Sequence, residues 1–195
     1  MEKRKKHPIN KIIFIVGLFL FFGCGSEYQP KPKAYLSLNY PKPDYKILEA
    51  SLPFSFEYNT FATVKNKTTL KPKIVYPQMK ATVYLNYSKV KKNLDSLLND
   101  AYQLPAKHMV KAAEIDEKIF IKETEKVYGG LFIVTGDAAS QYQFYLTDSL
   151  NHFLIGSLYF YSKPNYDSIY PAAQYIQKDI VHLIESIRWE KTDKL

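Results

Sequence analysis

Two neighbouring runs of residues, 141–147 and 152–161, constrain the fold of this chain most strongly. Both are rich in aromatic and β-branched residues, and the first places Tyr142, Phe144 and Leu146 at every second position, the period of a half-buried strand. The residues between the two runs, Asp148-Ser149-Leu150-Asn151, are mostly turn formers. The sequence therefore predicts a β-hairpin and, with it, an antiparallel sheet.

Further strands are predicted from short apolar or alternating runs elsewhere in the chain. They cover residues 53–58, 61–65, 73–76, 81–87, 115–122 and 127–135. The pair Gly129-Gly130 in the last of these leaves room for a bulge or a bend. An aromatic content of 15% suits such a sheet, because rings pack well on a pleated surface.

Helical spacing of apolar residues appears in two places. Ser88 is predicted to cap a helix, and Pro105 to begin a second short helix that runs to about Ala113. The terminal helix is predicted to be capped by Asp167 or Ser168. The apolar stripe of the first helix is Val90, Leu94, Leu97, Leu98 and Ala101, and that of the terminal helix is Ile176, Ile180, Leu183, Ile184 and Ile187.

The order of these elements indicates an α+β fold. A helix with one apolar stripe needs a sheet face to cover, so we expect a single antiparallel sheet flanked by the two main helices. This arrangement resembles the α/β/α sandwich of the Mog1/PsbP type, a likeness of fold that implies no function.

The N-terminus combines a basic stretch, residues 1–11, with an apolar run, residues 12–22. The run is short for a membrane span of about 20 residues but fits the apolar part of a secretory signal. It ends at Gly23-Cys24, which resembles a bacterial lipobox, where a small residue precedes the cysteine whose thiol receives the lipid. We expect residues 1–23 to be a lipoprotein signal peptide and Cys24 to be lipidated. An ordinary signal peptide, or a short anchor with an incidental cysteine, is the alternative.

Prolines and lysines are frequent after Cys24, which predicts an extended tether over residues 24–45 and a single α+β domain over residues 46–190. The formal net charge is +8, and without residues 1–23 it is about +4, because 22 basic residues then stand against 18 acidic ones. This modest balance does not favour a nucleic-acid partner.

The sequence lacks the motifs of the common catalytic and cofactor sites. The single cysteine excludes an intramolecular disulfide and a cysteine-rich zinc site. No HExxH, GxGxxG, GxxxxGK[ST] or GxSxG pattern is present, so we expect no metal, no cofactor and no enzymatic activity. Asp148, Ser149 and His152 offer the residue types of a nucleophilic triad, but within one turn; we interpret them as a hairpin loop and keep a hydrolase as an alternative.

The aromatic side chains of the predicted hairpin point to a partner surface. Alternation would place Phe144 and Phe160 in the core and leave Tyr145, Tyr159 and Tyr161 on the opposite face. Tyrosine is favoured at protein interfaces because it buries a large area and keeps a polar tip. We predict these three tyrosines as a partner-binding surface.

Several segments, taken together and in order, resemble the GldD family of gliding-motility lipoproteins. They are KPKAYLSL (31–38), PFSFEY (53–58), ATVYLNY (81–87), QFYLTDSLNHF (143–153), GSLYF (156–160), PNYDS (164–168) and LIESIRW (183–189), with the pair Tyr76-Pro77. The lipid-bearing cysteine of the family falls on Cys24.

This resemblance implies an envelope lipoprotein that is required for gliding motility and for type IX protein secretion. Its partners would be the membrane, through the lipid anchor, and other gliding-motility lipoproteins and envelope proteins. We expect attachment to the inner or outer membrane, a domain that faces the periplasm, and a non-catalytic role in assembly or stabilisation. The alternative is a periplasmic lipoprotein that binds a small ligand in a pocket between sheet and helix.

Overall fold

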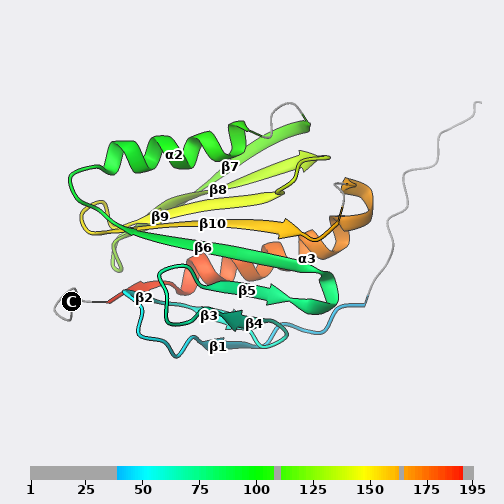
Figure 1. Ribbon diagram of the computed structural model, residues 1–195, viewed down its shortest axis with the longest axis horizontal. Helices are drawn as coiled ribbons and strands as arrows, with labels where there is room; N and C mark the ends of the chain where they lie inside the picture. Colours follow the sequence, from blue (N-terminus) through cyan, green and yellow to red (C-terminus); the bar gives the residue numbers. More distant parts are fainter. Residues whose placement is uncertain (1–38, 108–110, 163–164, 191–195) are drawn as a thin grey trace, which may run out of the picture. The chain divides into compact units, whose positions relative to one another are not determined.

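The computed structural model describes residues 39–107, 111–162 and 165–190, which Figure 1 draws in sequence colours. The strands are β1 (Tyr45–Ile47), β2 (Phe54–Ser55), β3 (Glu57–Asn59), β4 (Thr63–Lys65), β5 (Lys73–Tyr76), β6 (Ala81–Lys89), β7 (Ala112–Lys122), β8 (Val127–Gly136), β9 (Tyr142–Thr147), β10 (His152–Phe160) and β11 (Arg188–Trp189). The helices are the 3-10 helix η1 (Pro77–Met79), α2 (Leu94–Ala106) and α3 (Tyr166–Ser186).

The main sheet has seven strands in the order β4-β5-β6-β10-β9-β8-β7, and every neighbouring pair is antiparallel. The predicted hairpin forms its centre as β9 and β10, with Thr147 opposite Phe153. Opposite residues share a face of the sheet, so this register decides which side chains meet which helix. The prediction of an antiparallel hairpin is confirmed.

One face of the sheet packs against α3. The predicted stripe is buried there: Ile176, Ile180, Leu183, Ile184 and Ile187 lie in one apolar cluster with Phe144, Leu146, Leu154 and Leu158 of the sheet. The helix cap differs from the prediction, because the side chain of Asn165 accepts a hydrogen bond from the Ser168 N–H. Asp167 and Ser168 are therefore already inside the helix, which begins two or three residues earlier than predicted.

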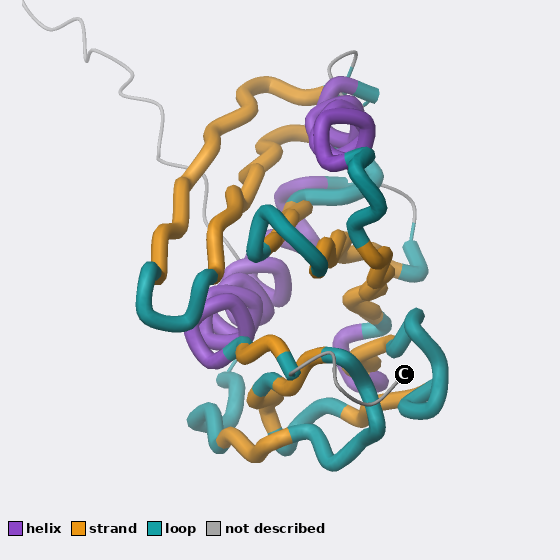
Figure 2. Tube along the Cα trace, turned by 90° about the vertical axis from the view of Figure 1, so that its left-hand side faces the viewer, coloured by secondary structure: helices purple, strands orange, loops and turns teal. Residues whose placement is uncertain are grey.

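The other face packs against α2. Phe132, Tyr145 and Phe153 form a second apolar cluster there, with Leu94, Leu97, Leu98 and Ile155 packed against it. Figure 2 shows α2 and α3 as separate purple tubes with the orange strands between them. The core is thus divided into two layers by the sheet.

Two helix predictions in this region are wrong. Ser88 does not cap a helix, because β6 continues to Lys89 and Ser88 lies opposite Phe153 of β10. Pro105 does not begin a second helix either, although residues 108–110 of that predicted helix lie outside the described residues. Pro105 lies in the last turn of α2, where its missing N–H removes only one helical hydrogen bond, and Ala112 already belongs to β7.

Two further ladders lie outside the main sheet. β1 pairs with β3, and β2 pairs with β11 at the end of the chain. β3 packs against α3, and its Glu57 N–H donates to the Ser186 hydroxyl at the end of that helix. The fold is α+β with one large antiparallel sheet between two helices, whereas the prediction that all strands share one sheet is wrong.

Candidate functional site

α2 covers only part of its face of the sheet, and the end of that face near β4 and β5 is open. Thr82 lies opposite Tyr159, and Tyr84 lies opposite Lys73, so these side chains share this face. Lys65 of β4 lies opposite Lys73, so its side chain is on the same face of the sheet. Together with Tyr161, which follows β10, these residues define what we call the tyrosine surface: Tyr84, Tyr159, Tyr161, Lys65 and Lys73.

The three tyrosines of this surface are held by contacts to one another. The ring of Tyr84 lies edge to face with that of Tyr159, with 5.8 Å between centroids. Its hydroxyl oxygen lies 3.0 Å from that of Tyr161, and the Thr82 hydroxyl donates to Tyr161 over 3.3 Å. Tyr159 and Tyr161 nevertheless remain 38% and 65% exposed. Their positions are therefore fixed by contacts within the domain although their rings are uncovered.

The charges around the tyrosine surface are positive. The Lys73 ammonium lies 5.0 Å from the centroid of the Tyr84 ring, within the range of a cation–π contact. Hydrogen bonds from Thr82 and Tyr84, together with the charges of Lys73 and Lys65, lower the pKa of Tyr161. The hydrogen bond to Tyr161 in turn raises the pKa of Tyr84, which is consistent with Tyr84 as the donor.

Tyr145 lies apart from Tyr159 and Tyr161. It faces α2, is 8% exposed, and its hydroxyl is hydrogen-bonded to that of Tyr102 at 3.1 Å. The predicted surface therefore keeps two of its three members in the open, because α2 covers Tyr145. Tyr84 was not among the residues predicted for this surface. Its position between Val83 and Leu85, which are both buried, could have indicated that its side chain faces the other side of β6.

A second exposed apolar area lies at the opposite edge of the sheet. Ile119 and Ile121 of β7 are 55% and 66% exposed and share the α2 side with Gly130 and Tyr128, which lie opposite them in β8. Phe120 separates the two isoleucines, and Lys118 and Lys122 flank them; charged side chains of this kind are common on an edge strand.

Asp148, Ser149 and His152 do not form a triad. The Asp148 carboxylate accepts the backbone N–H groups of Leu150, Asn151 and His152 at 3.0, 2.7 and 2.7 Å, so it orders the turn. The His152 imidazole instead contacts the Tyr87 hydroxyl at 2.9 Å. The geometry agrees with the interpretation of these residues as a hairpin loop.

A buried carboxylate ties α3 to the N-terminal strands. Asp179 is 5% exposed and accepts hydrogen bonds from the hydroxyls of Tyr45 and Tyr76 and from the Asn59 amide, at 2.8 to 3.2 Å. Burial raises the pKa of Asp179, and the hydrogen bonds oppose that change. Because its donors come from β1, β3 and β5, this network fixes the packing of the helix. This network could not be predicted from local patterns in the sequence, since its members are far apart along the chain.

The structure also contains a hollow of about 220 Å³ beside the end of α3. Its lining residues are Ile47, Ser55, Phe56, Glu57, Ser186 and Arg188. The charged groups in it are already paired: Glu57 contacts His182 at 2.7 Å, and Arg188 contacts Glu125 at 3.4 Å. This hollow is not the aromatic-lined cavity that the small-ligand alternative requires.

In the comparison with protein families, the model described as gliding motility lipoprotein GldD matches residues 25–189. The chain belongs to the GldD family of gliding motility lipoproteins. A comparison with curated proteins finds no match. The GldD match covers every strand and helix described above, so the tyrosine surface and the Asp179 network both lie within the family's own domain.

Membership in the GldD family supports association with the cell envelope and a role in gliding motility. The predicted attachment point, Cys24, and the signal peptide before it lie outside the described residues. Neither α2 nor α3, the two long helices of the described part, has the length and hydropathy needed to cross a membrane. Within the same part of the chain, His, Cys, Asp and Glu side chains do not gather in threes as a metal site would require.

Proposed function

We propose that this member of the GldD family acts as a non-catalytic assembly or stabilising component of the gliding machinery and, through it, of type IX protein secretion. A lipid on Cys24 would hold the domain at the inner or outer membrane, with the domain in the periplasm. The likeness to the Mog1/PsbP fold remains a prediction from the order of the elements and adds nothing to this role.

The observation that carries the proposal is the tyrosine surface. Tyr159 and Tyr161 are exposed on a part of the sheet that α2 leaves open, and their positions are fixed by Tyr84 and Thr82. Ordered tyrosines lose little conformational entropy on binding, which suits them to a protein contact. The residues expected of a hydrolase, by contrast, are used to build a turn.

The role of this surface is tested by truncating Tyr159 and Tyr161 together to alanine in the native organism. The matched control truncates Ile119 and Ile121, which are also two exposed apolar residues on the same face of the sheet but at its other edge. We expect loss of gliding and of type IX secretion in the tyrosine variant, normal amounts of the protein, and normal behaviour in the isoleucine variant. Loss in the isoleucine variant alone would move the contact to β7 and contradict the proposal.

The anchor is tested separately with Cys24→Ala. We expect this variant to lose membrane attachment and, with it, gliding and secretion, because assembly at the membrane needs a high local concentration. If Cys24→Ala leaves gliding and secretion intact, and the wild-type protein recovers no partner after solubilisation of the envelope, the assembly role is wrong.

A further inference from the structure

We propose that the tyrosine surface docks an acidic segment of a partner protein, with a carboxylate held between the Lys73 ammonium and the Tyr161 hydroxyl. This inference rests on the proposed function, because it names the chemistry of the partner that an assembly role requires. The five side chains of the tyrosine surface support it by their charge, their hydrogen bonds and their exposure.

The two lysines of this surface form a pair of like charges without an acidic neighbour. Lys65 and Lys73 lie directly opposite each other in β4 and β5. Like charges at opposite positions of a ladder are destabilising. Within the described residues, neither lysine has an ion pair with a carboxylate. An incoming carboxylate would relieve this repulsion, and none of the nearby side chains does so already.

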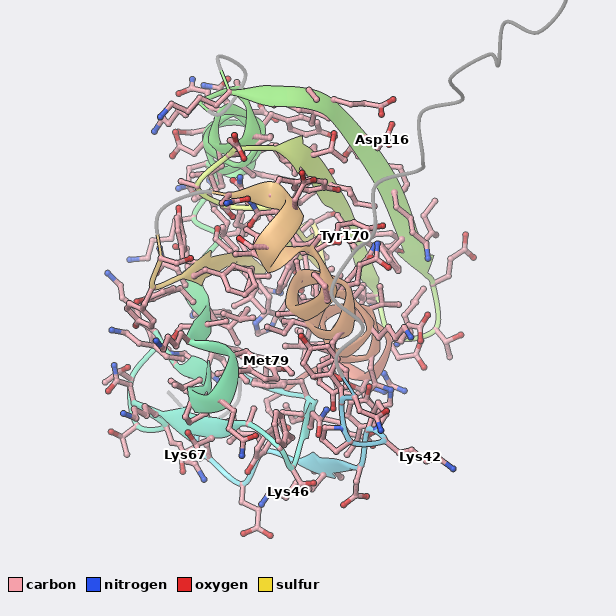
Figure 3. All side chains as sticks on the ribbon, turned by 90° about the vertical axis from the view of Figure 1, so that its right-hand side faces the viewer. Lys42, Lys46, Lys67, Met79, Asp116 and Tyr170 are labelled. Atoms are coloured by element: carbon pink, nitrogen blue, oxygen red, sulfur yellow. The ribbon has the colours of Figure 1, made fainter. Side chains whose placement is uncertain are left out.

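The segment of chain around these two lysines is also positively charged. Residues 63–76, which run from β4 through β5, contain four lysines and no acidic residue. Figure 3 places Lys67 of this segment and Asp116 of β7 at opposite ends of the sheet. β7 carries Glu114 and Glu117 as well, against Lys118 and Lys122, so this strand has a net charge of −1. The field of the domain would therefore guide an acidic partner to the tyrosine surface and away from β7.

The hydroxyls of Tyr84 and Tyr161 lie 3.0 Å apart, and either of them can donate to the other. The Tyr161 hydroxyl accepts from Thr82 and lies at hydrogen-bond distance from the Tyr84 hydroxyl. With Tyr84 as donor, the proton of Tyr161 is not used inside the domain. The positive charges of Lys73 and Lys65 act on the Tyr161 hydroxyl and favour a carboxylate there, since hydrogen bonds to an ionised acceptor are shorter and stronger than neutral ones.

The shape and composition of the surface favour a protein over a lipid bilayer. Its exposed apolar area consists of rings with hydroxyl tips on a rigid sheet, which is the composition of protein interfaces. A membrane-binding face would instead present aliphatic or aromatic side chains that can enter the bilayer, beside a larger set of cations. Exposed aliphatic side chains do occur in the described part, but only Leu70 lies in the segment that joins β4 to β5; the others are Ile47, Leu150, and Ile119 and Ile121 at the other edge.

The test uses the mature lipoprotein in detergent and a fluorescent oligoglutamate peptide as the probe, with oligoglutamine and phosphatidylglycerol vesicles for comparison. The main variant is Lys73→Glu. Lys118→Glu is the matched control, because Lys118 also lies over a ring, 4.9 Å from that of Phe120, but on β7. Tyr161→Phe removes only the hydroxyl and keeps the proposal testable if Lys73→Glu does not fold; Tyr102→Phe is its control.

We expect oligoglutamate to bind the wild-type protein, to bind Lys73→Glu about tenfold more weakly, and to bind Lys118→Glu with unchanged affinity. Tyr161→Phe should weaken binding and Tyr102→Phe should not. Absence of oligoglutamate binding, equal weakening by Lys73→Glu and Lys118→Glu, or binding of the vesicles alone would each overturn the proposal. If peptide binding fails while the Tyr159 and Tyr161 truncation still stops gliding, only the acidic partner is wrong. If the peptide binds but that truncation leaves gliding normal, the assembly role is wrong.

Discussion

The two faces of the seven-stranded sheet are made from the same kinds of residues but are covered to different degrees. On the α3 face, rings such as Phe144 are 1% exposed and the helix stripe fits against them. On the α2 face, the helix covers Tyr145, while Tyr159 and Tyr161 stay in the open. The first face holds the larger apolar cluster, and the second leaves Tyr159 and Tyr161 uncovered by the described part of the chain.

This contrast shows why an aromatic residue in a strand cannot be assigned a role from its type alone. Tyr145 and Tyr159 occur in neighbouring strands and point to the same face. Only the position of a 13-residue helix separates a core residue from a surface residue. If the two faces differ in this way, substitutions on them should differ in their effects on stability and on function.

The largest expected effect is that of Phe144→Ala on the α3 face. Removing a fully buried ring loses its transfer free energy and leaves a cavity, so the free energy of unfolding should fall by about 3–5 kcal/mol. Tyr161→Ala, on the open face, should lower it by less than about 1 kcal/mol. Urea unfolding followed by circular dichroism measures both. Similar losses in the two variants would mean that the faces are equally well packed.

Glycines on the two faces should respond differently to an added methyl group. A Cβ on Gly156 would lie 2.1 Å from Cζ of Phe144, whose ring is fixed in the core, so Gly156→Ala should cost about 1–3 kcal/mol. A Cβ on Gly130 would lie 2.5 Å from Oε1 of Glu117, the end of an exposed side chain that can move aside by giving up its hydrogen bond from Tyr102, and 3.1 Å from Cε1 of Tyr145. Gly130→Ala should therefore be the milder change by thermal unfolding, and the reverse order would contradict the difference in packing.

The two aspartates should give opposite dependences of stability on pH. Burial raises the pKa of Asp179, so its contribution is present below the ordinary pKa of an aspartate and is lost as the pH rises through the raised value. Burial also acts to raise the pKa of Asp148, but three backbone N–H groups outweigh it and the pKa is lowered. The contribution of Asp148 is then present above the ordinary value and is lost as the pH falls through the lowered one.

Unfolding free energies between pH 7 and pH 3 for the wild type, Asp179→Asn and Asp148→Asn measure this difference. As the pH falls, the wild type should gain stability relative to Asp179→Asn and lose stability relative to Asp148→Asn. The same sign for both variants would show that the Asp179 carboxylate is stabilised in its ionised form despite its burial.

The smallest expected effect on stability is that of Tyr161→Phe. It removes one exposed hydroxyl that accepts a hydrogen bond from Thr82, and surface changes of this kind alter stability by no more than about 0.5 kcal/mol. Differential scanning calorimetry should therefore give a melting temperature close to that of the wild type. A clear drop would make Tyr161 a structural residue and weaken its assignment to a partner contact.

Local patterns in the sequence were enough to predict much of the sheet and the terminal helix. The hairpin around Asp148 has a turn signal between two aromatic strands, and the stripe from Ile176 to Ile187 has helical spacing over three turns. Where two local signals compete, the prediction failed. Ser88 can cap a helix, but its neighbours Tyr87 and Lys89 continue the strand, and pairing with β10 decides the outcome.

Features that depend on distant residues were out of reach of such patterns. The ladder of β2 with β11 joins Phe54 to Trp189, and the Asp179 network joins β1, β3 and β5 to α3. One signal for the network was present, since Asp179 lies between Ile176 and Ile180 in the apolar stripe, where a charged residue needs buried partners. The contact of the Lys73 ammonium with the Tyr84 ring likewise depends on the register of β5 with β6.

The central claim is that the open face, and not the rest of the domain, meets the partner. A photo-crosslinking amino acid at position 161 in gliding cells tests it most directly, with the same amino acid at position 102 as control, because Tyr102 is also 44% exposed but lies on α2 beside Glu117. The account predicts a defined protein adduct from position 161 and none from position 102. The same adducts from both positions, or none from position 161, would contradict it.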